Sequence, residues 1–256
     1  MSETYVNPVD PPDEPFELLD PDGRPTGTVK PRHAVHRDGD WHGAFHVWIA
    51  WRDGAGEPCL LLQRRSRWKD TMAGMVDVSV GGHYRAGEQP GSRLGRDEPA
   101  RSAVLRELRE ELGLAVRAEA LVPVGRRWME RAGSGWIDRE VQDIFALPLP
   151  AAPERLAPDA GEVEALLVVE LPDLRALVAG EHATAPVWEL PVRADGGLDA
   201  PREAALTLEQ LVPDDDRYWE WMAETLRRLL EGTPPGWFEL RRRAQGGGER
   251  GGTWTR

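Results

Sequence analysis

Short apolar runs separated by turn residues occupy the first two thirds of the chain. Apolar residues over 45–51 and 59–66, with a Gly-containing turn at 53–56 between them, predict a β-hairpin. A Pro-Asp-Gly turn between strand-like runs at 16–20 and 26–29 predicts another hairpin nearer the N-terminus. Similar patterning predicts further strands at 76–80, 121–128, 140–147 and 164–170.

Segments with apolar residues at helical spacing occur between these strands and after them. The segment 105–112 carries leucines at helical spacing, and Gly113 is a natural helix stop. A short helix is predicted over 171–180 and an amphipathic one over 214–230. Strands combined with helices predict an α/β fold, an α/β/α sandwich with a mixed sheet and a C-terminal helical extension.

Changes in composition divide the chain into four segments. The first is rich in Pro and acidic residues, and the last is rich in Gly. The third is expected to be irregular over 181–213, with 186–190 extended, before the amphipathic helix. The segments are a flexible lead-in, 1–15; the main domain, 16–180; the C-terminal extension, 181–243; and a disordered tail, 244–256.

Charge and cysteine content narrow the classes of partner. The formal net charge is −12, which disfavours nucleic acid or an anionic membrane as the main partner, whereas a small phosphorylated substrate remains compatible. No apolar run approaches the length of a membrane span, and the N-terminus lacks the features of a signal peptide, so a cytoplasmic protein is expected. Cys59 is the only cysteine and is expected to be a small buried hydrophobe. A homodimer is compatible with the sequence.

The densest chemistry lies in the helix predicted before Gly113. Glu107, Glu110 and Glu111, called here the helix glutamates, are spaced i, i+3 and i+4, so they project from neighbouring positions on one side. Their mutual repulsion would be relieved by a divalent cation, and carboxylate oxygens are the ligands that Mg²⁺ prefers. The alternative is a solvated surface helix with Glu–Arg pairs.

The surrounding residues resemble the Nudix box, G-x5-E-x7-R-E-U-x-E-E-x-G-U, in which U is a bulky aliphatic residue. The segment RELREELGL beginning at Arg106 matches every fixed position at the end of the box, and five residues lie between Gly82 and Glu88. One Glu normally joins the two spacings, but here Glu98 begins the second one, ten positions after Glu88. The intervening residues are expected to form an inserted surface loop. Glu98 is expected to pair with Arg106, with Glu88 as the alternative.

This resemblance implies a Nudix fold over 16–180 and a hydrolase of a diphosphate joined to another group, dependent on Mg²⁺ or Mn²⁺. The helix glutamates would hold the cations, and Arg106 would orient the carboxylates of these glutamates. The general base is expected to be Glu110 or Glu107, with Glu140 as a further candidate. Gly82 would let the backbone approach the metal closely.

A second resemblance, over roughly residues 16–190, is to the Nudix subgroup that includes isopentenyl-diphosphate isomerase. It rests on the segments KPRHAVHRDGDWHGAFHVWI, LLLQRRSRWKD and VDVSVGGH. Arg65 and Lys69 match the diphosphate contacts of the isomerase, and Arg32 adds a third candidate. Guanidinium and ammonium groups suit phosphate oxygens, although solvated surface charges are the alternative.

The isomerase holds a divalent metal with three histidines and two glutamates, and most of that set has a counterpart here. Asp138 stands where one glutamate would be, whereas His33 and His46 match no ligand position and are expected to be structural. The implied ligands are His36, His42, His83 and Glu140.

One departure decides between the two activities. The isomerase has its catalytic cysteine in a Cys-Gly-His run, and this chain has Gly81 at that place. Hydrolysis is therefore favoured over isomerisation. The alternatives are an isomerase-like enzyme that needs no cysteine and a module that binds a phosphorylated metabolite without turnover. Whether the substrate is a nucleoside-diphosphate type or a prenyl diphosphate stays open.

Overall fold

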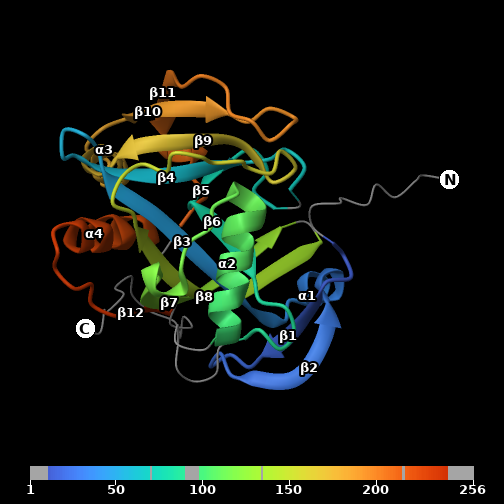
Figure 1. Ribbon diagram of the computed structural model, residues 1–256. Coiled ribbons are helices and arrows are strands. Elements are labelled where there is room, and N and C mark those ends of the chain that lie inside the picture. Colours follow the sequence, from blue (N-terminus) through green and yellow to red (C-terminus); the bar gives the residue numbers. More distant parts are fainter. Residues whose placement is uncertain (1–10, 70, 90–97, 134, 215–216, 242–256) are drawn as a thin grey trace.

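A computed structural model describes residues 11–69, 71–89, 98–133, 135–214 and 217–241. Most of the expected lead-in and the expected tail therefore fall outside the described residues. Within them, twelve strands form one mixed sheet whose main path runs β11-β10-β9-β4-β3-β8-β7-β12 (Figure 1). Of the described helices, none is both long and apolar enough to cross a membrane.

The N-terminal hairpin is confirmed. It comprises β1 (Pro15–Leu19) and β2 (Pro25–Pro31), paired antiparallel. The short helix α1 (Arg32–Asp38) follows, and the sequence analysis did not anticipate it. This helix ends at Gly39, which is left-handed with φ 69° and donates its N–H to the carbonyl of Val35. Helix α1 brings the segment before β3 back against the sheet, where the candidate site lies.

The central strand is β3 (Trp41–Arg52), which is almost entirely buried. It pairs antiparallel with β4 (Pro58–Arg65) and parallel with β8 (Trp136–Pro148). The single strand expected at 76–80 is divided into β5 (Val76–Asp77) on β4 and β6 (Val80–His83) on β3. The sheet is therefore split beside β3. One part continues through β4 and β5 and the other through β6, and side chains of both parts have room at the split.

Ser79 explains why the strand is divided. Its hydroxyl donates to the carbonyl of Leu61 at 2.5 Å and accepts the backbone N–H of Ile49 at 2.8 Å. A side-chain oxygen thus satisfies backbone groups of both β4 and β3 where a continuous ladder would otherwise pass.

The α/β/α arrangement is confirmed by the two faces of β3. On one face, Phe45 and Val47 belong to the core that contains the predicted helix, α2 (Glu98–Leu112). On the other, Trp48 belongs to the core that contains α3 (Leu171–Val178) and α4 (Tyr218–Leu230). Figure 1 shows α2 lying across one face of the sheet. Alternate side chains of one strand therefore join both cores.

The predicted stop of α2 is also confirmed. Gly113 has φ 66°, and its N–H donates to the carbonyl of Arg109 at 3.0 Å. This is the αL cap that a left-handed glycine allows. A side chain at Gly113 would also lie 2.9 Å from the Cβ of Ala157.

The expectation that 181–213 is irregular was wrong. After β9 (Val163–Glu170), the chain forms the antiparallel pair β10 (Thr184–Pro191) and β11 (Arg202–Thr207), which extends the sheet. The extended segment expected at 186–190 lies within β10, whose residues alternate between exposed and buried, whereas β11 was not expected. At the opposite edge, β12 (Phe238–Leu240) pairs parallel with β7 (Val122–Gly133).

Candidate active site

A cavity beside the split in the sheet is lined by about half of the predicted site residues, whereas the helix glutamates and His42 are not in its lining. Its lining comes from α1, from strands β3 to β8 and from α4. Of the residues that the sequence predicts to be functional, the lining includes Arg32, His36, Arg65, Lys69, Gly82, His83, Asp138 and Glu140.

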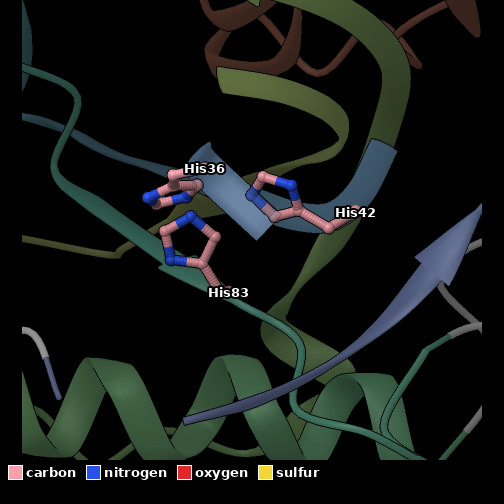
Figure 2. A group of neighbouring side chains, drawn as sticks. All are labelled: His36, His42 and His83. Carbon is pink, nitrogen blue, oxygen red and sulfur yellow. The ribbon is translucent and has the colours of Figure 1, made fainter. Parts of the chain in front are cut away.

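Three histidines from three different elements meet at this cavity. His36 comes from α1, His42 from β3 and His83 from β6, and their rings lie close together in Figure 2. One ligand nitrogen from each lies within 4.8 Å of the others. His42 also lies within that distance of oxygens of Asp138 and Glu140. The structure thus brings together all the side chains of the implied metal site.

His42 is the member best prepared to bind a metal. Its Nδ1 lies 3.2 Å from the carbonyl oxygen of Asp40, so Nδ1–H donates and Nε2 keeps a free lone pair. That Nε2 is buried and has no hydrogen-bond partner among the described residues. Burial, together with the charge of His83, lowers the pKa of His42 to about 3. The ring is therefore neutral, which is the state that binds metals.

Glu140 lies beside His42 in the parallel register of β3 and β8. Its Oε1 is 2.9 Å from His83 Nε2, and its Oε2 accepts the Gln142 amide at 2.5 Å. Burial alone would raise the pKa of Glu140. The hydrogen bond from His83 and the charge of His83 outweigh burial and lower that pKa well below its ordinary value. Glu140 is therefore a carboxylate, with its charge balanced within the cluster.

The helix glutamates are arranged around Arg106. This side chain lies 3.1 Å from Glu88 and 3.4 Å from Glu110, and it also pairs with Glu107. The expectation that Glu98 provides the partner is corrected in favour of Glu88. Glu98 begins the same helix as Arg106, two turns away, and residues at that spacing are not neighbours on a helix. The side chain of Glu98 is not among those described.

The three helix glutamates do not converge on one point. Glu110 is turned to solvent, with 56% of its side chain exposed. Glu111 is only 5% exposed and accepts the Gln63 amide at 3.3 Å. Burial, then the charges of Glu162 and Glu107, raise the pKa of Glu111 well above 4.5. Burial likewise raises the pKa of Glu107. Burial and neighbouring like charges therefore oppose ionisation of both carboxyl groups.

Gly82 joins the two clusters. A Cβ atom at this position would lie 2.8 Å from Glu107 Cγ and 2.8 Å from a ring carbon of Phe45, so only glycine fits without displacement. The next residue is His83, a member of the histidine cluster. At Gly81, by contrast, a Cβ atom would make only ordinary contacts, the nearest 3.5 Å from His46. The strand β6 thus places one glutamate against its backbone and one histidine in the cavity.

Comparison with known proteins identifies the family. Residues 41–190, more than half of the chain, match the family model of the NUDIX domain. The chain belongs to the Nudix hydrolase family. An uncharacterized Nudix hydrolase of Clostridium acetobutylicum is 32% identical over 162 residues, which are 63% of this chain and 72% of that protein.

Relatives of a different activity match as well. An isopentenyl-diphosphate Delta-isomerase of Frankia alni is 32% identical over 197 residues, covering 76% of this chain and 92% of that protein. Among solved structures, a Nudix hydrolase from Alicyclobacillus acidocaldarius aligns with a TM-score of 0.45 and 17% identity, covering 76% of this chain and 97% of that one.

The basic residues expected at the diphosphate all line the cavity of this Nudix hydrolase. Arg65 lies 3.3 Å from Asp77, and Lys69 lies 2.6 Å from Glu162. Arg32 lies 3.4 Å from His83 Nδ1. Each cation is thus held in place by a neighbouring side chain, which reduces the side-chain entropy that binding an anion would cost.

Sequence reasoning missed two residues that lie beside the predicted site residues. Glu162 precedes β9 in a loop and carries no motif, yet its charge reaches Glu111 and Glu107. His46 was expected to be structural, but it lines the cavity. The parity of β3 could have revealed it, because His42 and His46 are four residues apart on one strand and so face the same side. Cys59 is a buried free thiol, as expected.

Proposed function

We propose that this protein hydrolyses the diphosphate linkage of a small molecule with the help of Mg²⁺ or Mn²⁺. The observation that carries the proposal is the junction at Gly82, where the charged box helix meets a cavity lined by basic side chains. A nucleoside-diphosphate type and a prenyl diphosphate are the two substrate classes considered.

The residues present fit a divalent cation on the box helix. Glu111 and Glu107 are buried carboxylates whose pKa values are raised, because burial and neighbouring like charges oppose ionisation. A hard cation held by Glu107 and Glu111, with Glu162 nearby, would offset that repulsion. When bound, such an ion neutralises charge on the diphosphate and acidifies water.

Side chains of the box helix would act as general base, bind the outer cation and orient the carboxylates. Glu107 is the better general base, because it lies against the backbone at Gly82 and its raised pKa suits proton acceptance near neutral pH. Glu110 is exposed and interacts with Arg106, so it is assigned to outer cation binding. Arg106 orients both carboxylates and is itself held by Glu88.

Arg65, Lys69 and Arg32 would bind the diphosphate oxygens. Arg65 offers a planar fork for two oxygens, and Lys69 offers a point charge. The ion pairs with Asp77 and Glu162 hold both side chains at the cavity before substrate arrives. A diphosphate between them and the box helix would present its linkage to Glu107.

A second activity is supported by the histidine cluster. His42 Nε2 is a buried lone pair without a hydrogen-bond partner among the described residues, and Glu140 is a carboxylate beside it. This donor set suits a transition metal. Glu140 could then move a proton on an allylic diphosphate, as an isomerase-like enzyme would require. Gly81 provides no thiol for the second proton transfer, so hydrolysis is preferred.

The deciding experiment is a product assay on the purified chain. Nucleoside-diphosphate derivatives and prenyl diphosphates are incubated with Mg²⁺, with Mn²⁺ and with a chelator, and both released phosphate and isomerised product are measured. We expect metal-dependent phosphate release from one class and no isomerised product. Isomerised product without phosphate release would replace the proposal with the isomerase, and binding without either product would replace it with a sensor.

A further inference from the structure

The C-terminal helix contributes a polar contact to the cavity wall from outside the matched family region. Tyr218 opens α4 and is 2% exposed. Its Oη lies 2.8 Å from Trp48 Nε1 and 3.0 Å from His46 Nδ1. The guanidinium of Arg127 lies over the Tyr218 ring, 4.3 Å from its centre. Helix α4 therefore fixes the orientation of His46, a residue of β3.

This contact also bears on the proton of His46. The Trp48 indole can only donate, so the Tyr218 oxygen accepts from it. When the Tyr218 hydroxyl donates to His46 Nδ1, the proton of the neutral imidazole is on Nε2. Burial lowers the pKa of His46 to about 4, so the ring stays neutral near pH 7.

The Nε2 atom faces the cavity at Gly81. A Cβ atom at Gly81 would lie 3.8 Å from Nε2, so the missing side chain leaves this edge of the ring uncovered. Among the described residues, Nε2 has no hydrogen-bond partner, although both Gly81 and His46 line the cavity. In that tautomer Nε2–H is a donor held towards the cavity, and no acceptor for it lies among the described residues.

We propose that His46, oriented by Tyr218, donates a hydrogen bond to an acceptor on the organic group attached to the diphosphate. The substrate class is then a diphosphate with a polar organic group, such as a nucleoside, rather than a hydrocarbon chain. This inference rests on the proposed function only for the placement of the diphosphate at Arg65 and Lys69. A hydrocarbon group would leave the buried donor unsatisfied, which disfavours it by about tenfold or more.

Binding of ligands that cannot be hydrolysed tests this inference separately from turnover. The affinities of the α,β-methylene analogues of adenosine diphosphate and of isopentenyl diphosphate are measured by calorimetry with Mg²⁺. We expect the wild-type chain to bind the adenosine analogue about tenfold more tightly or better. Preference for the isopentenyl analogue, or binding of neither at millimolar concentration, would overturn the inference. Selective binding without phosphate release in the product assay would refute only the proposed hydrolysis.

Three variants separate hydrogen bonding from packing. His46→Leu removes the donor and should weaken the adenosine analogue about tenfold while changing the isopentenyl analogue less than about twofold. His46→Gln keeps a side-chain N–H and should restore most of the affinity. Tyr218→Phe removes only the hydroxyl that orients His46 and should give a smaller loss of the same selectivity. Equal losses for both ligands, or no loss in His46→Leu, would show that His46 is merely structural.

The proton assignment is tested on the unmodified protein. Long-range proton–nitrogen correlation spectra of the histidine rings distinguish the two neutral tautomers. We expect His46 to carry its proton on Nε2 at neutral pH, and a proton on Nδ1 would overturn its assignment as the donor.

Discussion

Two buried glutamates at this site have pKa values shifted in opposite directions. Glu111 on α2 and Glu140 on β8 are 5% and 7% exposed. Burial and the like charges of Glu162 and Glu107 raise the pKa of Glu111, whereas Glu140 has His83 as a hydrogen-bond donor and its pKa is lowered. Burial therefore does not set the charge state by itself. The immediate partners decide whether a carboxylate needs a cation from outside.

The two clusters also differ in how the chain assembles them. The helix glutamates lie within five consecutive residues, so helix geometry alone places them near one another. The histidine cluster draws on α1, β3, β6 and β8, and no local rule connects those elements. We infer that the box helix is the centre of hydrolysis and that the histidine cluster is a separate metal site.

The largest expected effect is on kcat, and it distinguishes the helix glutamates from the histidine cluster. Glu107→Gln should lower kcat about 10²- to 10⁴-fold, because it removes the proposed base. Glu140→Gln should lower phosphate release less than about tenfold if its cluster is not the hydrolytic centre. The exposed Glu119→Gln serves as the matched control and should behave like wild type. A greater loss in Glu140→Gln than in Glu107→Gln would move the hydrolytic centre to the histidine cluster.

Metal affinity provides the next largest effect. His83→Gln should weaken binding of a transition metal such as Mn²⁺ or Zn²⁺ about 10- to 100-fold, because it removes one proposed ligand and a partner of Glu140. Competition with a coloured chelator measures this directly. The exposed His33→Gln is the control. If His83→Gln binds the metal as tightly as wild type, the histidines do not form the site.

The pH dependence of stability should have opposite signs in the two clusters. The folded-state pKa of Glu111 is raised above 4.5, so the folded state holds that proton more tightly than the unfolded state. The free energy of unfolding of the metal-free protein should therefore fall as pH rises above about 4.5. The folded-state pKa of Glu140 is lowered. Its contribution to the free energy of unfolding is therefore present above the pKa that Glu140 has in the unfolded state, and it is lost as pH falls through the folded-state pKa.

Thermal unfolding with a chelator at pH 5 and pH 8 measures this difference. Glu111→Gln should raise Tm at pH 8 by a few degrees relative to wild type, and by less at pH 5. Glu140→Gln should lower Tm at pH 8. Adding Mg²⁺ should stabilise wild type and should stabilise Glu111→Gln less. A Glu111→Gln variant that is less stable than wild type at pH 8 would contradict the charge argument.

The smallest expected effect comes from the two glycines at the junction. Gly82→Ala should cost about 1–3 kcal/mol of stability, because its Cβ would meet Glu107 and Phe45 at 2.8 Å. Gly81→Ala has room and should unfold close to the wild-type temperature, which makes it the matched control. Gly81→Cys should also fold, yet convert no isopentenyl diphosphate efficiently. Equal destabilisation by the two alanine variants would mean that Gly82 is not the tight contact.

The sequence alone determined the features that depend on residues close together in the chain. The box helix, its stop at Gly113, the N-terminal hairpin and the hairpin of β3 and β4 follow from local spacing and turn residues. The family also followed from the sequence, because the box requires specific residue types at fixed separations.

The tertiary structure decided which distant residues meet. Arg106 forms its ion pair with Glu88 and not with Glu98, because the loop carrying Glu88 folds back onto α2 whereas Glu98 lies two turns away on the same helix. The tertiary structure also placed Tyr218 against His46, 172 positions earlier in the chain. Neither contact has a periodic signal, since each depends on how separate elements pack. The helix fixes the spacing of its own charges, but only packing determines which neighbours balance them and hence which carboxylates need a metal.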